Sequence, residues 1–211
     1  MRANHFVCAG ALATLCVLNT EPAAALADRQ EWHLTPMGIL GASAPSEGGR
    51  RSWAFAGGAG ARVAYGIADF FEMGGHVGFT TSQQITFPNA VVAGQPGNLV
   101  GNQYAVELAL DARLIGDVHL SSAFARIHPL LGVRAGGLAR ILTSQVLVDD
   151  HNALIMRPDN RVSIVPSVTG YAGLEYRFAR TWLAGLTGSF TYAGPSYFAA
   201  GASVELSFMT Y

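Results

Sequence analysis

The sequence predicts an all-β protein: an eight-stranded antiparallel up-and-down transmembrane β-barrel, preceded by a cleavable signal peptide. The clearest observation is the stretch 103–114, QYAVELALDARL, in which apolar and polar residues alternate one for one. As successive strand side chains point to opposite faces, one face is apolar and the other carries Glu107, Asp111 and Arg113. Composition agrees, because 50% of the residues are hydrophobic and 13% are charged, about half the charge of an average soluble domain.

The first 27 residues have the features of a secretory signal. Arg2 precedes an apolar run over residues 6–18, and Ala25 to Ala27 form a small-residue cleavage site. The run is shorter than the roughly 20 residues that a membrane-spanning helix needs. We therefore expect a signal peptide over residues 1–27 and a barrel domain over residues 28–211. Cys8 and Cys16 lie in the signal, and the residues before Cys16 do not resemble a lipoprotein signal.

Eight segments of the mature chain alternate as strands do. They cover residues 31–41, 52–65, 70–82, 103–114, 123–142, 161–178, 182–192 and 197–211. The connections 66–69, 115–122 and 179–181 are short, whereas 42–51, 83–102 and 143–160 are longer and rich in turn residues. With both ends in the periplasm, the longer set is external, as in bacterial barrels. The short connection 193–196 is the exception.

Aromatic residues bracket several strands on their apolar faces. Trp53 and Tyr65 flank the second strand, Phe71 and Phe79 the third, and Trp182 and Tyr192 the seventh. Tilted strands of about ten residues cross the roughly 25 Å apolar band of an outer membrane, which aromatic girdles border on both sides. These six residues are therefore predicted to form the girdles.

From about residue 31 to residue 211 the pattern resembles the small outer-membrane β-barrel proteins, the OmpA-domain and OmpX-like class of eight-stranded barrels. The resemblance rests on alternation and carries no sharp motif. It implies a monomer in the outer membrane of a Gram-negative bacterium, in contact with lipid and lipopolysaccharide. It also implies that Tyr211 is the terminal aromatic residue read by the barrel-assembly machinery. Tyr211 is one residue out of phase with Leu206 and Phe208, so either a bulge lies near Met209 or the register of the last strand differs.

The inward face carries nearly matched charges. They are Glu72, Glu107, Asp111, Glu175 and Glu205 against Arg62, Arg113, Arg126, Arg134 and Arg177. An eight-stranded barrel is barely wide enough for its own side chains, so we expect these charges to pair and close the lumen. The alternative is a small porin-like channel for ions or small solutes.

Other functions have weaker support in the sequence. His119 and Ser121, or Asp149, Asp150 and His151, could belong to a lipid- or peptide-hydrolysing barrel, but no complete catalytic set is evident. His76 and His128 are interpreted as hydrogen-bonded lumen residues. A soluble lipocalin-like carrier would turn the charged face to water. The net charge of −1 argues against nucleic acid.

We therefore assign no catalytic residue, cofactor or metal. The function expected is a structural or surface-interaction role through the long external loops, in envelope integrity, adhesion or binding.

Overall fold

The computed structural model describes residues 31–47, 50–116, 127–179 and 181–210. It contains ten strands in this part of the chain: β1 (Trp32–Glu47), β2 (Arg50–Arg51), β3 (Ala54–Ala68), β4 (Phe71–Val92), β5 (Gln95–Ile115), β6 (Ile127–Val148), β7 (Leu154–Met156), β8 (Arg161–Arg177), β9 (Trp182–Tyr192) and β10 (Tyr197–Thr210). No helix among these residues is long and apolar enough to cross a membrane.

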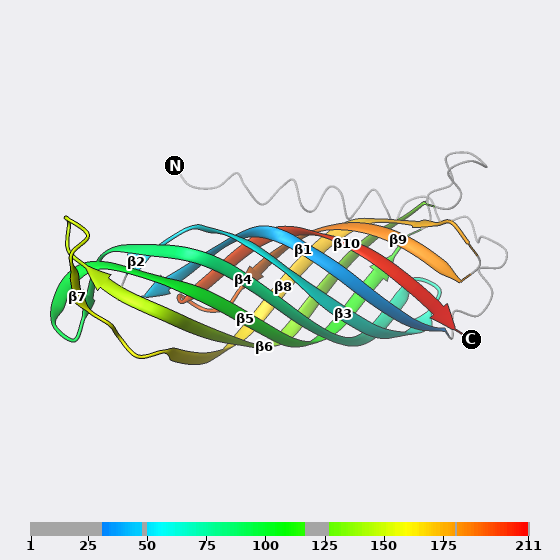
Figure 1. Cartoon of the computed structure of the whole chain (residues 1–211). Helices are drawn as coiled ribbons and strands as arrows, with labels where there is room; N and C mark the ends of the chain where they lie inside the picture. Colours follow the sequence, from blue (N-terminus) through cyan, green and yellow to red (C-terminus); the bar gives the residue numbers. More distant parts are fainter. Residues whose placement is uncertain (1–30, 48–49, 117–126, 180, 211) are drawn as a thin grey trace, which may run out of the picture.

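Eight of the strands form a closed ring. The order is β10, β9, β8, β6, β5, β4, β3 and β1, with every pair antiparallel, and β1 pairs with β10 to close the sheet. The short strands β2 and β7 lie outside this order and pair antiparallel with the ends of β1 and β6. Figure 1 shows the tilted strands winding around one elongated barrel. The predicted eight-stranded up-and-down barrel is confirmed.

Burial follows the predicted faces and is inverted relative to a soluble protein. On β5, Leu108 and Leu110 are 63% and 74% exposed, whereas Asp111 and Arg113, which follow them on the opposite face, are at most 1% exposed. Polar side chains therefore fill the interior and apolar side chains cover the outside, as in transmembrane barrels.

The two ends of the barrel differ. Trp32 pairs with Thr210, so β1 begins and β10 ends at the same end, which we call the near end (Figure 1). The opposite, far end carries a projection made of residues 83–92 of β4, 95–102 of β5 and 143–148 of β6. We call it the extension.

The extension corrects the prediction of three long loops. Residues 42–47 continue β1, and residues 50–51 form β2. Residues 83–92 and 95–102 are the paired ends of β4 and β5, and residues 143–160 include the end of β6 and all of β7. The turn between β4 and β5 is only Ala93 and Gly94, whose φ angles are +49° and +80°. Such left-handed pairs suit two-residue hairpins.

Irregular positions in β4 hid this hairpin from the sequence pattern. The register with β5 shifts once between Ser82 and Ile85 and again between Phe87 and Ala90. Gln84 and Asn89, the residues at these bulges, have φ angles of +53° and +52°. The Oδ1 of Asn102 accepts a hydrogen bond from the Gln84 backbone N–H at 3.0 Å, and that of Asn98 accepts one from Asn89 at 3.2 Å.

The extension has a hydrophobic core of its own. It consists of Ile85, Phe87, Ala90, Leu99 and Leu147, all at most 2% exposed, with Ala54, Val92 and Met156 packed against them. Burial of these side chains gives the extension a fixed shape that polar loops would lack.

The remaining predictions agree to different degrees. The seventh predicted strand has the bounds of β9, and residues 193–196 form the predicted turn. Pairing of β10 is continuous through Met209, which is buried, so no bulge lies there. Tyr211, Arg126, His119, Ser121 and the predicted signal peptide lie outside the described residues.

Candidate functional site

Arg113 is the centre of an ion-pair network inside the barrel. From β5 its Nη2 donates to Glu72 Oε2 on β4 at 2.8 Å, and its Nη1 donates to Glu175 Oε1 on β8 at 2.7 Å. Glu205 Oε2 on β10 lies 3.8 Å from the same Nη1. One guanidinium thus joins four strands, which a planar group with five donors allows.

Asp111 forms a second centre, one inward position farther from the near end. Its carboxylate accepts hydrogen bonds from Arg62 Nε at 2.6 Å, Arg134 Nε at 3.0 Å and the Tyr171 hydroxyl at 2.8 Å. Arg62 also donates to Glu72 Oε2 at 2.9 Å, which links the two centres. Seven of the predicted lumen charges therefore form one network, and all seven are at most 5% exposed.

Tyr171 was missed by the sequence analysis, although it lies on the polar face of its strand. Its register partner on β6 is Gly132. A Cβ at Gly132 would lie 2.2 Å from the Tyr171 ring, so only glycine leaves room for the ring to cross the interior. The ring then stacks under the guanidinium of Arg134, 4.4 Å from its Cζ. An aromatic residue opposite a glycine was the available signal.

Two other predicted lumen charges lie outside the network of seven. Glu107 is partly buried, and its Oε1 accepts a hydrogen bond from the Thr169 hydroxyl at 3.0 Å. Arg177 lies near Met209, whose Sδ is 3.6 Å from its Nη2. Arg140 on β6 is a further inward-facing charge, which is not among the predicted lumen charges. It is buried near the far-end turn and donates to Ser196 O at 3.0 Å.

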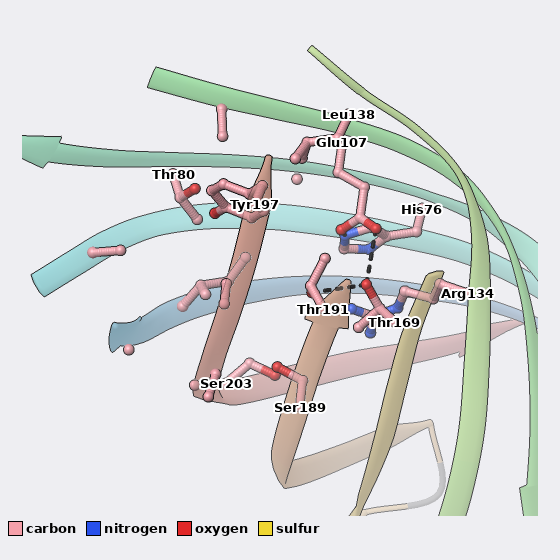
Figure 2. Close-up of a pocket in the computed structure, with 18 of the residues that line it drawn as sticks. His76, Thr80, Glu107, Arg134, Leu138, Thr169, Ser189, Thr191, Tyr197 and Ser203 are labelled. Carbon is pink, nitrogen blue, oxygen red and sulfur yellow. Dashed lines mark hydrogen bonds and ion pairs between the residues drawn. The ribbon is translucent and has the colours of Figure 1, made fainter. Parts of the chain in front are cut away.

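A cavity of about 70 Å³ lies between the ion network and the far end of the barrel; we call it the chamber. Figure 2 shows His76, Glu107, Arg134 and Thr169 gathered on one part of its wall. Toward the far end, Tyr197 and Leu138 belong to an apolar cluster that borders the chamber.

The predicted girdle residues lie on the outer surface in two bands. Near the far end, Trp53, Phe79 and Tyr192 are between 44% and 65% exposed. The Phe79 ring stacks on Tyr104, with centroids 6.1 Å apart, and the Tyr192 ring contacts Phe198 at 5.1 Å. Near the other end, Tyr65 contacts Trp32 and Trp182 contacts Phe208, both at 5.1 Å, and Phe71 begins β4.

The described residues do not assemble a metal site. No group of three or more His, Cys, Asp and Glu side chains in this part of the chain could hold a metal ion. The Oδ1 of Asp149 accepts hydrogen bonds from the backbone N–H groups of His151 and Ala153, at 2.9 and 2.8 Å. This carboxylate therefore organises the turn between β6 and β7.

Comparison with solved structures shows the same fold in small outer-membrane barrels. Neisserial surface protein A (NspA) superimposes with a TM-score of 0.54 at 10% identity, covering 84% of this chain and 96% of that protein. Ail, the attachment invasion locus protein of Yersinia pestis, was solved in complex with the heparin analogue sucrose octasulfate. It superimposes with a TM-score of 0.51 at 10% identity, covering 86% of this chain and 99% of Ail.

No protein-family model matches the sequence, and no curated protein matches it either. The resemblance to eight-stranded outer-membrane barrels is thus confirmed at the level of the fold.

Proposed function

We propose that this protein is an integral outer-membrane β-barrel that holds the extension at the cell surface in a structural or adhesive role, without enzymatic activity. The hydrophobic core of the extension carries this proposal. A segment used only to connect two strands needs no buried core. A segment that presents a fixed surface to a partner does, because preorganisation lowers the entropic cost of binding.

The exposed face of the extension suits an uncharged partner. Residues 83–102 include no Asp, Glu, Lys, Arg or His. Side chains such as Gln83, Thr86 and Gln95 are exposed there, while Phe87 and Leu99 point inward. Affinity would then come from hydrogen bonds and shape, with little dependence on salt concentration.

A closed lumen is part of the proposal. The network around Arg113 and Asp111 contains residues from β3, β4, β5, β6, β8 and β10. An eight-stranded barrel has space for little more than its side chains. The competing function is a small porin-like channel, for which this network would have to open.

The aromatic bands support lipid and lipopolysaccharide as partners, because such rings favour the two interfaces of a membrane. The closed sheet has no free edge within the ring, which is compatible with a monomer. The proposal includes export directed by residues 1–27 and assembly through the C-terminal strand in a Gram-negative outer membrane.

A shortened variant tests the surface role. Ser82 pairs with Gln103, so an Asn-Gly turn joining these two residues replaces the β4–β5 hairpin and retains the ring. We expect this variant to fractionate with outer membranes like the full protein but to lose adhesion or envelope integrity in whole cells. Recovery of the full protein in the soluble periplasm, or unchanged adhesion and permeability in the variant, would refute the proposal.

Planar-bilayer recording tests the closed lumen separately. The purified barrel should give no steady open-channel current, and Arg113→Ala should produce current because it removes the central guanidinium. Steady current through the unmodified protein would favour the porin-like function.

A further inference from the structure

The chamber contains charged groups whose hydrogen-bonding capacity the protein does not use. Among the described residues, Glu107 Oε2 forms no hydrogen bond, and it lies 3.8 Å from His76 Nε2, which is longer than a hydrogen bond. His76 is 4% exposed, and its Nδ1 is buried without a hydrogen-bond partner among the described residues. Glu107 and His76, which both line the chamber, therefore have hydrogen-bonding capacity that the described residues do not use.

Arg134 supplies unused donors on the same wall. Its Nε is bound to Asp111, but its Nη1 and Nη2 donate to none of the residues that the structure describes. Arg134 and Glu107 both line the chamber, yet they form no ion pair within 4.0 Å in the described parts of the chain. By contrast, Arg113 contacts two carboxylates within 3.1 Å. The guanidinium of Arg134 and the carboxylate of Glu107 thus line the same cavity without pairing with each other.

The size and lining of the chamber define which ligand could bridge Arg134 and Glu107. A single water needs roughly 10–15 Å³ of such volume, so about 70 Å³ accommodates about five non-hydrogen atoms. Hydroxyl groups of Ser189, Thr191 and Ser203 line one side, and Met37 and Leu138 are among the apolar residues on the others. The chamber is therefore amphipathic, as small-molecule sites are.

We propose that the chamber binds one small molecule with an acceptor at one end and an N–H donor at the other, either a neutral amide or an amino acid of glycine size. The acceptor end meets the Nη groups of Arg134, and the N–H end donates to Glu107 Oε2. This site is independent of the surface role proposed for the extension.

Nuclear magnetic resonance of the refolded barrel in detergent micelles tests the site with four probes at equal ionic strength. Acetamide and glycine carry both ends, whereas methylammonium has only the donor and acetate only the acceptor. We expect acetamide or glycine to shift the amide signals of Thr191 and Ser203 saturably. The two single-ended probes should bind at least tenfold more weakly. The comparison of acetamide with glycine distinguishes the neutral from the zwitterionic ligand.

Two variants locate the binding. Glu107→Gln should weaken binding of the preferred probe about tenfold, because a neutral amide oxygen replaces the charged acceptor and forms a weaker hydrogen bond. Glu47→Gln, at the far-end ion pair with Arg161, is the matched control and should bind like the unmodified protein. If Glu107→Gln does not fold, Thr191→Val replaces it, since it removes a chamber hydroxyl with little change in volume.

Three results would overturn the proposal. The first is the absence of a saturable shift with any probe, which leaves a chamber that holds only water. The second is equal binding of a single-ended probe. The third is equal weakening by the chamber variant and by Glu47→Gln.

Discussion

Strands β4, β5 and β6 pass through two regions with opposite arrangements of polarity. In the ring, Phe79 on β4 points outward and His76 points inward. In the extension, Phe87 on the same strand is buried at 1% exposure and Gln83 is exposed. The proposed function accounts for the reversal, because in an outer membrane lipid would contact the outside of the ring and water the outside of the extension.

A one-residue bulge produces the reversal. Phe79 and Phe87 are separated by eight residues, so an unbroken strand would place both on the same face. The extra residue at Gln84 moves the side chains of residues 85–88 to the other face, and the second bulge at Asn89 shifts the phase once more. β6 contains a similar shift, between the partners of Val100 and Asn102, where Ser144 has a φ angle of +53°. The bulges therefore mark where we infer that the membrane ends.

The largest loss of stability is expected from a substitution inside the ring. Arg113→Leu leaves Glu72, Glu175 and Glu205 close together without their shared cation. Removing one partner of a buried ion pair costs about 3–5 kcal/mol. Urea unfolding in detergent micelles should show a loss of this size in the free energy of unfolding.

Arg157→Leu is the control, because Arg157 is exposed in the segment between β7 and β8. It should change the unfolding free energy by no more than about 0.5 kcal/mol. A loss below 1 kcal/mol for Arg113→Leu would mean that packing and lipid, rather than ion pairs, hold the ring together.

A smaller and more local effect is expected in the core of the extension. Leu99→Ala removes a side chain that is 2% exposed and packs within the extension core. We expect a loss of about 2 kcal/mol, at the lower end of the range for such substitutions, because an extension in water can partly collapse around the cavity. Hydrogen exchange should accelerate at residues 85–101 and remain unchanged at the ring. Uniform acceleration would show that the two regions unfold as one unit.

Alternation predicted the ring because each ring strand has a polar interior on one side and an apolar exterior on the other, so its side chains alternate between polar and apolar. Strand β9 matches its predicted bounds for this reason. The extension could not be predicted in this way, because Gln84 and Asn89 interrupt the pairing register and its polar and turn-forming residues resemble a loop. Pro88 and Gly94 are among these turn-forming residues, yet Pro88 lies within β4 and Gly94 lies in the two-residue turn between β4 and β5.

The same limit applies to the lumen. Alternation placed Arg62, Glu72 and Asp111 on the inward face, but pairing depends on how strands far apart in sequence lie across the barrel. Arg113 and Glu175, 62 residues apart, meet only in the closed ring. Tyr171 was overlooked because an aromatic residue on a polar face contradicts the simple two-sided pattern.

The hydrogen bonds at the bulges should make a smaller contribution to the free energy of unfolding. Asn102→Ala removes the acceptor of the Gln84 backbone N–H, a loss of about 1 kcal/mol for one hydrogen bond. Hydrogen exchange at Gln84 should accelerate in this variant, whereas Gln95→Ala, in an exposed position beside the turn, serves as the control. Unchanged exchange at Gln84 would show that core packing alone holds the bulge.

The smallest effect on stability is expected from a substitution at the edge of β4. The same substitution should affect dimer formation. No described strand pairs with β4 beyond Thr81 on the β3 side, so residues 83–92 form a free edge in water. Pro88 lacks an N–H and, with the two bulges, makes this edge a poor template for another strand. Pro88→Thr should change stability by no more than about 0.5 kcal/mol yet increase dimer formation in sedimentation experiments in detergent. Pro158→Thr, in the segment after β7, should not. If both variants remain monomeric at the same concentrations, the bulges alone protect the edge and the proline has no part in it.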